Sequence, residues 1–341
     1  MSYCVLIATG LTITVGVRMT GKVVFLIRSS DTARRDAVLS AKPAGWKLSL
    51  VDPDEGEEQI AKELEDAQFL LALGGRVSSE VLKTAKQLKL IQAWGMGTDH
   101  LPVRWCIENG IFVANAGGAN AIAVAEHTVL LMLACLKRFT AFNHSIREGS
   151  FLGTNGNAGS HELYDKTVGI VGFGNIGRRV AKLCYGFGAA IVYYERQFVP
   201  YALSADLKAR AVALDELLTI SDIVSLHVPS YADNRKMMGW EQLKRMKSSS
   251  YLINTSRGDI VDEDALVRAL NEKVIAGAGL DVFDPEPPNP ANPLFTMYNV
   301  TVTPHIAGLS DENMKPRCET IWRNLMLVAE GKKPLNLVQE Y

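Results

Sequence analysis

The chain has 341 residues, of which 48% are hydrophobic and 21% are charged, and its formal net charge is −1. This composition is typical of packed globular domains, and the length predicts about two of them. The near-neutral charge argues against a nucleic-acid partner, which favours a basic surface. The five cysteines form no CxxC or Cys/His cluster. We therefore expect no metal site and a reducing, cytoplasmic location.

The N-terminal segment is apolar between Cys4 and Val17, but it has no charge at its start. A secretory signal needs a basic start and a small-residue cleavage site, and the run is too short to cross a membrane. We expect residues 1–18 to form an extension outside the fold, and we expect no membrane partner.

From Val23 onward, short apolar segments alternate with helical segments, which predicts a parallel sheet covered on both faces. The strands expected here are Val23–Ile27, Trp46–Val51, Gln68–Leu73, Leu88–Trp94 and Ile111–Asn115. The helices expected are Asp31–Ala41, Glu57–Asp66, Ser79–Ala85, Pro102–Asn109 and a long apolar helix at Ala121–Arg138.

The alternation starts again after a loop rich in Gly and Asn at residues 153–160. The strands expected in this second half are Thr167–Val171, Ala190–Tyr194, Ile223–His227, Tyr251–Asn254, Gly277–Asp281 and Val300–Thr303. Helices are expected at Ile176–Gly186 and at about Asp311–Glu330, where Gly331 ends the last one. The pattern predicts an α/β protein with two doubly wound parallel-sheet domains.

A glycine-rich segment, Gly172-Phe173-Gly174-Asn175-Ile176-Gly177, follows one of these strands. In G-x-G-x-x-G, the first glycine allows a tight turn, the second lets the backbone approach a pyrophosphate, and the third allows close helix packing. The next strand is followed by Glu195, whose carboxylate could accept hydrogen bonds from the adenosine ribose. Glu195 would repel a 2′-phosphate, which favours NAD over NADP, whereas Arg196 could attract one. The alternative is a structural turn with a surface Glu.

Arg257, Glu286 and His305 each follow one of the last three expected strands. In open α/β sheets, ligands bind at the edge where the parallel strands end. Taken alone, each of these residues could serve only a structural purpose, as a surface charge, a loop residue or a structural histidine. Together they supply a proton donor, a carboxylate to orient it and a fixed cation, which are the groups that carbonyl reduction requires.

These segments resemble the D-isomer-specific 2-hydroxyacid dehydrogenases, a family that includes phosphoglycerate dehydrogenases, glycerate dehydrogenases and glyoxylate/hydroxypyruvate reductases. The resemblance runs from about Val23 to Pro334. Besides the glycine-rich segment it rests on Val113–His127, Leu226–Pro229 and Met246–Glu286. One departure is Ser230-Tyr231, where the family usually has Leu-Thr after the proline.

The resemblance implies a Rossmann NAD-binding domain, residues 118–309, inserted into a flavodoxin-like substrate domain made of residues 19–117 and 310–341. It implies that His305 is the acid/base, that Glu286 orients it and that Arg257 grips the substrate. A carboxylate cradle of backbone amides is implied at Gly95, Met96 and Gly97. The implied NAD contacts are Gly172, Phe173, Gly174, Asn175, Ile176, Gly177, Glu195, Pro229, Thr255, Asp281 and Gly308.

The activity that the resemblance implies is hydride transfer between NAD(H) and a small D-2-hydroxy acid or 2-oxo acid. The chain ends soon after Glu330, and the loop Leu73-Gly74-Gly75-Arg76 lacks an Arg at the position aligned for phosphate recognition, although Arg76 lies near. Both features favour glyoxylate or hydroxypyruvate, with D-3-phosphoglycerate as the alternative.

A different alternative is an NAD-sensing, corepressor-like interaction protein, because such proteins can retain the triad. Formate oxidation is disfavoured, since that branch has Gln in place of Glu286.

The long apolar helix at Ala121–Arg138 also predicts a partner. It has more Ala, Val and Leu than a single exposed face can leave in water. We expect a homodimer built through this helix.

Overall fold

The computed structural model describes residues 20–73, 75–151 and 159–338, which form two compact units. One unit combines the described residues up to Gly117 with those from Met314 onward, and the other runs from Gly118 to Asn313. The extension expected at residues 1–18 lies outside the described residues. Each unit has its own sheet and its own hydrophobic core.

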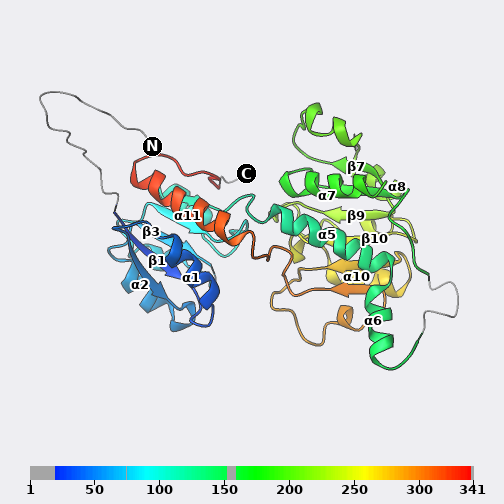
Figure 1. The fold of residues 1–341 in the computed structure, drawn as a ribbon, viewed down its shortest axis with the longest axis horizontal. Helices are drawn as coiled ribbons and strands as arrows, with labels where there is room; N and C mark the ends of the chain where they lie inside the picture. The colour runs from blue at the N-terminus through cyan, green and yellow to red at the C-terminus, as the bar shows by residue number, and fades with distance from the viewer. Residues whose placement is uncertain (1–19, 74, 152–158, 339–341) are drawn as a thin grey trace, which may run out of the picture. The chain divides into compact units, whose positions relative to one another are not determined.

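The first unit contains a five-stranded parallel sheet with the order β2-β1-β3-β4-β5. Helices pack on both faces, and α11 comes from the C-terminal end of the chain, shown in red in Figure 1. The strands are β1 (Lys22–Leu26), β2 (Lys47–Val51), β3 (Phe69–Ala72), β4 (Leu90–Ala93) and β5 (Phe112–Ala114). One face is covered by α1 (Thr32–Ala41) and α11 (Met314–Ala329), and the other by α2 (Glu57–Leu64), α3 (Ser79–Leu82) and α4 (Val103–Glu108).

Helix α11 is held to the first unit by a buried aromatic side chain. The indole ring of Trp322 meets the ring of Trp46 edge to face, with 5.7 Å between centroids. Its N–H donates to the carbonyl of Val38 in α1 at 3.2 Å. A buried indole needs such an acceptor, and this one joins the C-terminal helix to the first helix of the unit.

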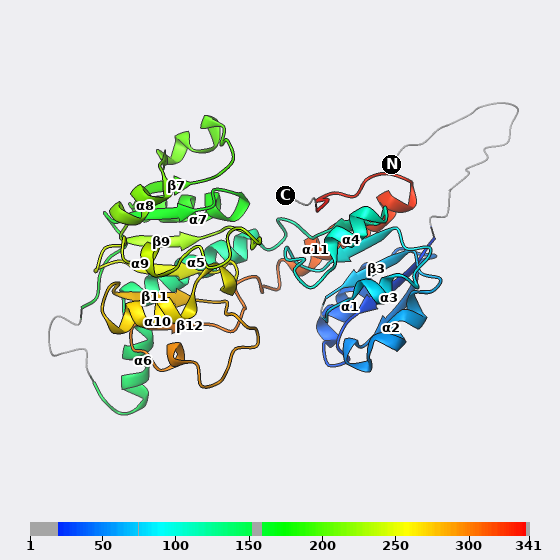
Figure 2. The same ribbon diagram turned by 180° about the vertical axis from the view of Figure 1, so that it is seen from behind.

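The second unit contains a seven-stranded parallel sheet with the order β12-β11-β10-β9-β6-β7-β8. Its strands are β6 (Thr167–Val171), β7 (Ala190–Tyr194), β8 (Arg210–Ala211), β9 (Ile223–Leu226), β10 (Tyr251–Asn254), β11 (Gly277–Leu280) and β12 (Val300–Val302). One face is covered by α5 (Ala121–Leu136) and α7 (Asn175–Gly186), and the other by α8 (Leu214–Ile220), α9 (Trp240–Leu243) and α10 (Glu263–Asn271). Figure 2 shows this layered arrangement from behind.

The prediction of an α/β protein with two parallel sheets is confirmed. The strands expected to include His227, Asp281 and Thr303 end one residue earlier, so these side chains lie in the loops beyond the sheet. The prediction that one helix runs to Arg138 is wrong. Arg138 has a left-handed backbone with φ 51°, which ends α5 and starts a new helix, α6 (Phe139–Arg147).

Several properties bear on the kind of site that the units can hold. Among residues 20–338, apart from the gaps named above, no helix is both long and apolar enough to cross a membrane. The described cysteines are buried free thiols. Within the same residues, no three His, Cys, Asp or Glu side chains converge as metal ligands would.

Candidate active site

The three proposed catalytic residues lie at the carboxyl edge of the second unit's sheet. Arg257 follows β10, Glu286 follows β11 and His305 follows β12, and these strands are neighbours in the sheet. The edge is where loops of parallel strands meet, so side chains far apart in sequence converge there.

His305 and Glu286 form a direct pair. Nδ1 of His305 lies 2.6 Å from Oε2 of Glu286, and the amide of Phe283 donates to the other carboxylate oxygen at 3.1 Å. The hydrogen bond to Glu286 raises the pKa of His305, although partial burial and the Arg257 cation oppose this effect. Burial acts to raise the pKa of Glu286, but the contacts with His305 and Phe283 outweigh it and the pKa is lowered. The pair therefore favours an ionised carboxylate beside an imidazolium.

Arg257 lies in a turn that the buried Asn254 shapes. The amide nitrogen of Asn254 donates to the carbonyl of Arg257 at 2.8 Å, and its oxygen accepts from the backbone and hydroxyl of Ser256. Nη1 of Arg257 donates to the carbonyl of Ser256 at 2.7 Å. The guanidinium is close enough to lower the pKa of both His305 and Glu286. A planar cation thus accompanies the His305–Glu286 pair.

Gly258 brings the Arg257 turn against the loop of Glu286. A Cβ at this position would lie 2.0 Å from the carbonyl carbon and oxygen of Phe283. A Cβ and a carbonyl group cannot approach each other that closely, so only glycine permits this contact between the two loops.

Replacing Gly258 with Ala is therefore expected to displace the turn or the loop. We expect the free energy of unfolding to fall by about 1–3 kcal/mol, the usual effect of overpacking, and kcat/KM to fall with it. Chemical denaturation and steady-state kinetics measure both. Gly239→Ala is the matched control, because its Cβ would be no closer than 3.5 Å to other atoms. Equal effects of the two substitutions would contradict this account.

Asp281 organises the loop of His305. Its side chain is fully buried, and its two oxygens accept from the amides of Ile306 at 2.9 Å and Ala307 at 2.8 Å. Its carbonyl accepts from the amide of His305 at 2.8 Å. His305 has a left-handed backbone with φ 54°, a conformation that persists when the surrounding contacts determine it. Asp281, expected as an NAD contact, thus has its carboxylate occupied by the chain itself.

A second histidine reaches the same carboxylate from helix α5. Nε2 of His127 lies 2.9 Å from the hydroxyl of Thr303, which donates to Asp281. His127 and Thr303 are 176 residues apart in sequence. Sequence reasoning placed His127 within a family motif but assigned it no role. Only the adjacency of α5 and the end of β12 reveals this contact.

His227 is another candidate for proton transfer, because it follows β9 at the same edge. Loss of hydration lowers its pKa to about 3, and Nε2 lies 2.8 Å from the hydroxyl of Ser225. An imidazole with this pKa stays neutral at ordinary pH, so it cannot donate a proton as an acid. Of His227 and His305, only His305 has a pKa shifted toward the protonated form that reduction requires.

The glycine-rich turn fits a dinucleotide. Gly172 has φ +94°, and a Cβ there would meet the carbonyl oxygen of His227 at 2.6 Å. A Cβ on Gly177 would lie 2.1 Å from the carbonyl oxygen of Gly172, whereas a Cβ on Gly174 meets nothing within 4 Å. The first and third glycines are required by packing, and the second leaves open space. Helix α7 begins here with no side-chain cap, so its N–H groups can meet phosphate oxygens.

Glu195 lies beside this turn, at the end of β7. Its carboxylate accepts from the amide of Phe173 at 2.9 Å and from the amide of Arg196 at 2.8 Å. The side chain is thereby fixed next to the glycine-rich segment. Asn175 and Ile176, the other expected contacts, form the first residues of α7.

The remaining positions expected to contact NAD lie in loops at the same edge. Thr255 is buried, and its hydroxyl lies 2.9 Å from that of Thr128 in α5. The carbonyl of Gly308 accepts from Asn313 at 2.8 Å, and the carbonyl of Pro229 accepts from Asn234 at the same distance.

The departure from the family pattern after Pro229 has a structural consequence. The hydroxyl of Ser230 donates to the carboxylate of Asp259 at 2.6 Å, and Asp259 follows Arg257 by two residues. The amide of Tyr231 donates to the side chain of Asn234 at 2.7 Å. Ser230 thus joins the loop after β9 to the turn of Arg257.

The residues expected to form a carboxylate cradle lie in the first unit. Gly95, Met96 and Gly97 lie in the loop after β4, where the carbonyl of Met96 accepts from the side chain of Asn115 at 3.1 Å. The side chain of Met96 is 43% exposed. Gly95 and Gly97 on either side of it are half-buried.

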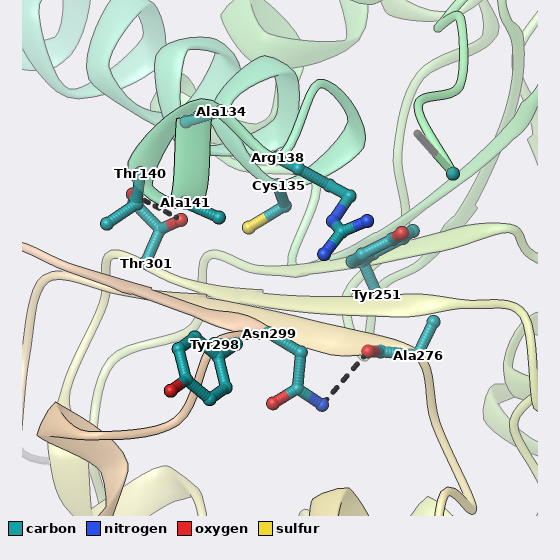
Figure 3. Close-up of a pocket in the computed structure, with 11 residues that line it drawn as sticks. Ala134, Cys135, Arg138, Thr140, Ala141, Tyr251, Ala276, Tyr298, Asn299 and Thr301 are labelled. Atoms are coloured by element: carbon teal, nitrogen blue, oxygen red, sulfur yellow. Dashed lines mark hydrogen bonds between the residues drawn. The ribbon is translucent and has the colours of Figure 1, made fainter. Parts of the chain in front are cut away.

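A cavity of about 270 Å³ lies elsewhere in the second unit. Figure 3 shows Cys135 of α5 and Arg138, which directly precedes α6, facing Tyr251 and Asn299. Tyr251 begins β10, and Asn299 precedes β12, so the cavity is at the amino edge of the sheet. It contains none of the proposed site residues.

Comparisons with known proteins agree with this geometry. Residues 129–307 match the family model of the D-isomer specific 2-hydroxyacid dehydrogenase, NAD binding domain. The glyoxylate reductase of Thermococcus litoralis is 39% identical over 272 residues, which cover 78% of this chain and 81% of that protein. The D-3-phosphoglycerate dehydrogenase of Archaeoglobus fulgidus is 35% identical over 268 residues, which cover 77% of this chain but 49% of that protein.

Solved structures extend the likeness to the fold. A glyoxylate reductase from Paecilomyes thermophila superposes with a TM-score of 0.82 at 28% identity, covering 94% of this chain and 98% of that one. The chain belongs to the D-isomer-specific 2-hydroxyacid dehydrogenase family and is an NAD-dependent oxidoreductase of that family.

Proposed function

We propose that this enzyme reduces a small, unphosphorylated 2-oxo acid such as glyoxylate or hydroxypyruvate with NADH, and oxidises the D-2-hydroxy acid in reverse. The 2.6 Å contact between His305 and Glu286, beside Arg257, is the observation that supports it most directly. The names of relatives such as the Thermococcus litoralis glyoxylate reductase support the substrate class.

In this proposal the three residues divide the work at the substrate. The planar guanidinium of Arg257 binds the carboxylate and the carbonyl oxygen of the 2-oxo acid, a geometry that lysine cannot reproduce. Protonated His305 gives its Nε2 proton to the oxygen that becomes the hydroxyl, while Glu286 holds the other ring nitrogen. The nicotinamide, when bound, supplies the hydride. Neutral His305 takes the proton back in the oxidation direction.

The cofactor would be held by the turn from Gly172 to Gly177, with Glu195 on the ribose hydroxyls. The open face of Gly174 and the uncapped start of α7 support this placement. We propose that Asp281 acts by positioning the His305 loop, because its carboxylate is buried among backbone donors.

We also propose that the first unit, with the C-terminal helix α11, is the substrate domain. Its boundary would lie near residues 117 and 310, and its loop Gly95–Gly97 would offer backbone amides to the substrate carboxylate. The exposure of Met96 within this loop supports an open position for a ligand.

Steady-state kinetics on a panel of 2-oxo acids, each with NADH and NADPH, tests the proposed function. We expect the highest kcat/KM with glyoxylate or hydroxypyruvate. Preference for 3-phosphohydroxypyruvate would instead favour a phosphoglycerate dehydrogenase, which Arg76, exposed after β3, could serve. NADH binding without turnover of any acid would favour an NAD-sensing interaction protein.

The surface of α5 supports the proposal of a homodimer. Ile122 and Leu130 are 61% and 55% exposed, and Glu126 lies between them on the same helix face. A hollow of about 540 Å³ on this face is lined by α5 and by Arg179 and Lys182 of α7. A second copy related by a two-fold axis could place its acid near these bases.

Light scattering at micromolar concentration is expected to give the mass of a dimer. Ile122→Glu is expected to give the mass of a monomer, because it places a charge in the apolar contact. Phe198→Glu, which changes an exposed side chain on another loop, is the control. A monomeric parent protein would exclude the homodimer.

A further inference from the structure

Arg196 and Asp233 form an ion pair beside the proposed ribose site. Nη1 of Arg196 lies 2.7 Å from Oδ2 of Asp233, and both side chains are at least half exposed. Arg196 directly follows Glu195, whose carboxylate is fixed by the amides of Phe173 and Arg196. The pair therefore begins one residue away from the group proposed to recognise the ribose.

The fold explains why these two residues meet. Strand β6, which leads into the glycine-rich turn, lies between β9 and β7 in the sheet. Arg196 lies after β7 and Asp233 lies after β9. Their ion pair thus joins the two loops that flank the glycine-rich turn, although the residues are 37 positions apart in sequence.

Asp233 comes from a turn with defined geometry. The neighbouring Asn234 is 4% exposed, and its side chain bonds the amide of Tyr231 and the carbonyl of Pro229. These bonds hold the backbone of the turn that carries Asp233, whereas the long Arg196 side chain can adjust to the short Asp233 side chain. Asp233 therefore determines where the guanidinium lies.

The charges bear on the choice between NAD and NADP. NADP has a phosphate on the 2′-oxygen of the adenosine ribose, and arginine is the usual partner of such a group. Arg196 is the residue that could supply this contact. Its charge is matched by two carboxylates, Glu195 and Asp233, so this cluster of one cation and two anions has a net charge of −1. A cluster with a net negative charge does not attract a phosphate dianion.

We propose that Asp233 is a cofactor-specificity residue, which draws Arg196 into an ion pair and so keeps its guanidinium from a 2′-phosphate. Glu195 then discriminates by direct repulsion, and Asp233 does so by engaging the adjacent Arg196. The inference rests on the proposed role of Glu195 at the ribose.

The test uses the affinities of the full-length enzyme for NADH and NADPH, measured by fluorescence titration. Asp233→Asn keeps the size of the side chain and removes its charge. We expect the Kd for NADPH to fall about three- to fivefold, the range that release of an exposed ion pair allows. The Kd for NADH is expected to change by less than about twofold, because Glu195 and its amide donors are unchanged.

Two further variants make the result specific. In the double variant Arg196→Ala with Asp233→Asn, the Kd for NADPH is expected to equal that of Arg196→Ala alone, because no guanidinium remains to be released. Asp215→Asn breaks an ion pair with Arg245 of the same 2.7 Å length and similar exposure, and it is expected to leave both affinities unchanged.

The inference is overturned if Asp233→Asn leaves the NADPH affinity unchanged, or if the gain persists without Arg196. Persistence would mean that Asp233 repels the phosphate directly. Binding is measured without turnover, so the outcome is separate from the proposed reaction. An enzyme inactive on every 2-oxo acid can still show the shift, and an active one can lack it.

Discussion

Glu286→Gln is expected to move the acid limb of the pH profile for hydroxy-acid oxidation to lower pH. Oxidation needs neutral His305 as the base, so kcat/KM rises as the pH increases through the pKa of His305. The hydrogen bond and charge of Glu286 raise that pKa. The amide keeps an acceptor for the ring but removes the charge, so the pKa falls and the limb moves with it. The maximum rate is expected to fall as well, because the ring is held less firmly.

His305→Ala is expected to abolish this limb and to lower kcat by about 10²-fold or more, as removal of a general acid/base does. The dissociation constant of NADH should be retained in both variants, since the glycine-rich turn is unchanged. Asp284→Asn is the matched control: the amide of Asp284 donates to Glu263, while the His305 ring contacts Glu286. A limb that moves in Asp284→Asn and stays in Glu286→Gln would mean that the partner of His305 is misassigned.

Arg257→Lys is expected to lower kcat/KM for the 2-oxo acid by about 10²-fold, although it keeps the positive charge. An ammonium group lacks the planar fork that can hold a carboxylate and a carbonyl oxygen together, and the loss of one donor to a reacting oxygen costs about this factor. Most of the effect should lie in KM if Arg257 binds substrate and transition state alike, and in kcat if it acts on the reacting oxygen. Arg245→Lys, at an exposed ion pair, is the control and should be neutral.

Arg257→Ala adds a test of sign. The Arg257 cation lowers the pKa of His305, so its removal should raise that pKa and move the acid limb for oxidation to higher pH. The direction is opposite to that expected for Glu286→Gln. Limbs that move in the same direction in the two variants would show that the charges do not act on His305 as the geometry indicates.

The sequence by itself determined the features of this protein that depend on residues close together in the chain. Apolar runs of four to six residues predict the parallel strands because a strand buried on both faces must be apolar along its length. The segment from Gly172 to Gly177 predicts its turn because the positive φ of Gly172 and the close contact of Gly177 with the Gly172 carbonyl both arise within the segment. Arg257, Glu286 and His305 could be predicted because each lies in the segment that follows a recognisable strand, and parallel strands end at one edge.

The partners of those residues depended on the order of strands in the sheet. Nothing near Asp281 in sequence indicates that its carboxylate holds the loop of His305, or that His127 reaches Thr303 from α5. The contact of Gly258 with Phe283 requires β10 and β11 to be neighbours.

The ion pair of Arg196 with Asp233 has the same origin. It requires β7 and β9 to lie on either side of β6, an order that is not the order of the chain. Local pattern specifies which segments form strands, but the pairing of those strands is decided by packing over the whole sheet. The tertiary structure therefore decided which charges meet, and with them the geometry that sets the pKa of His305 and the position of Arg196.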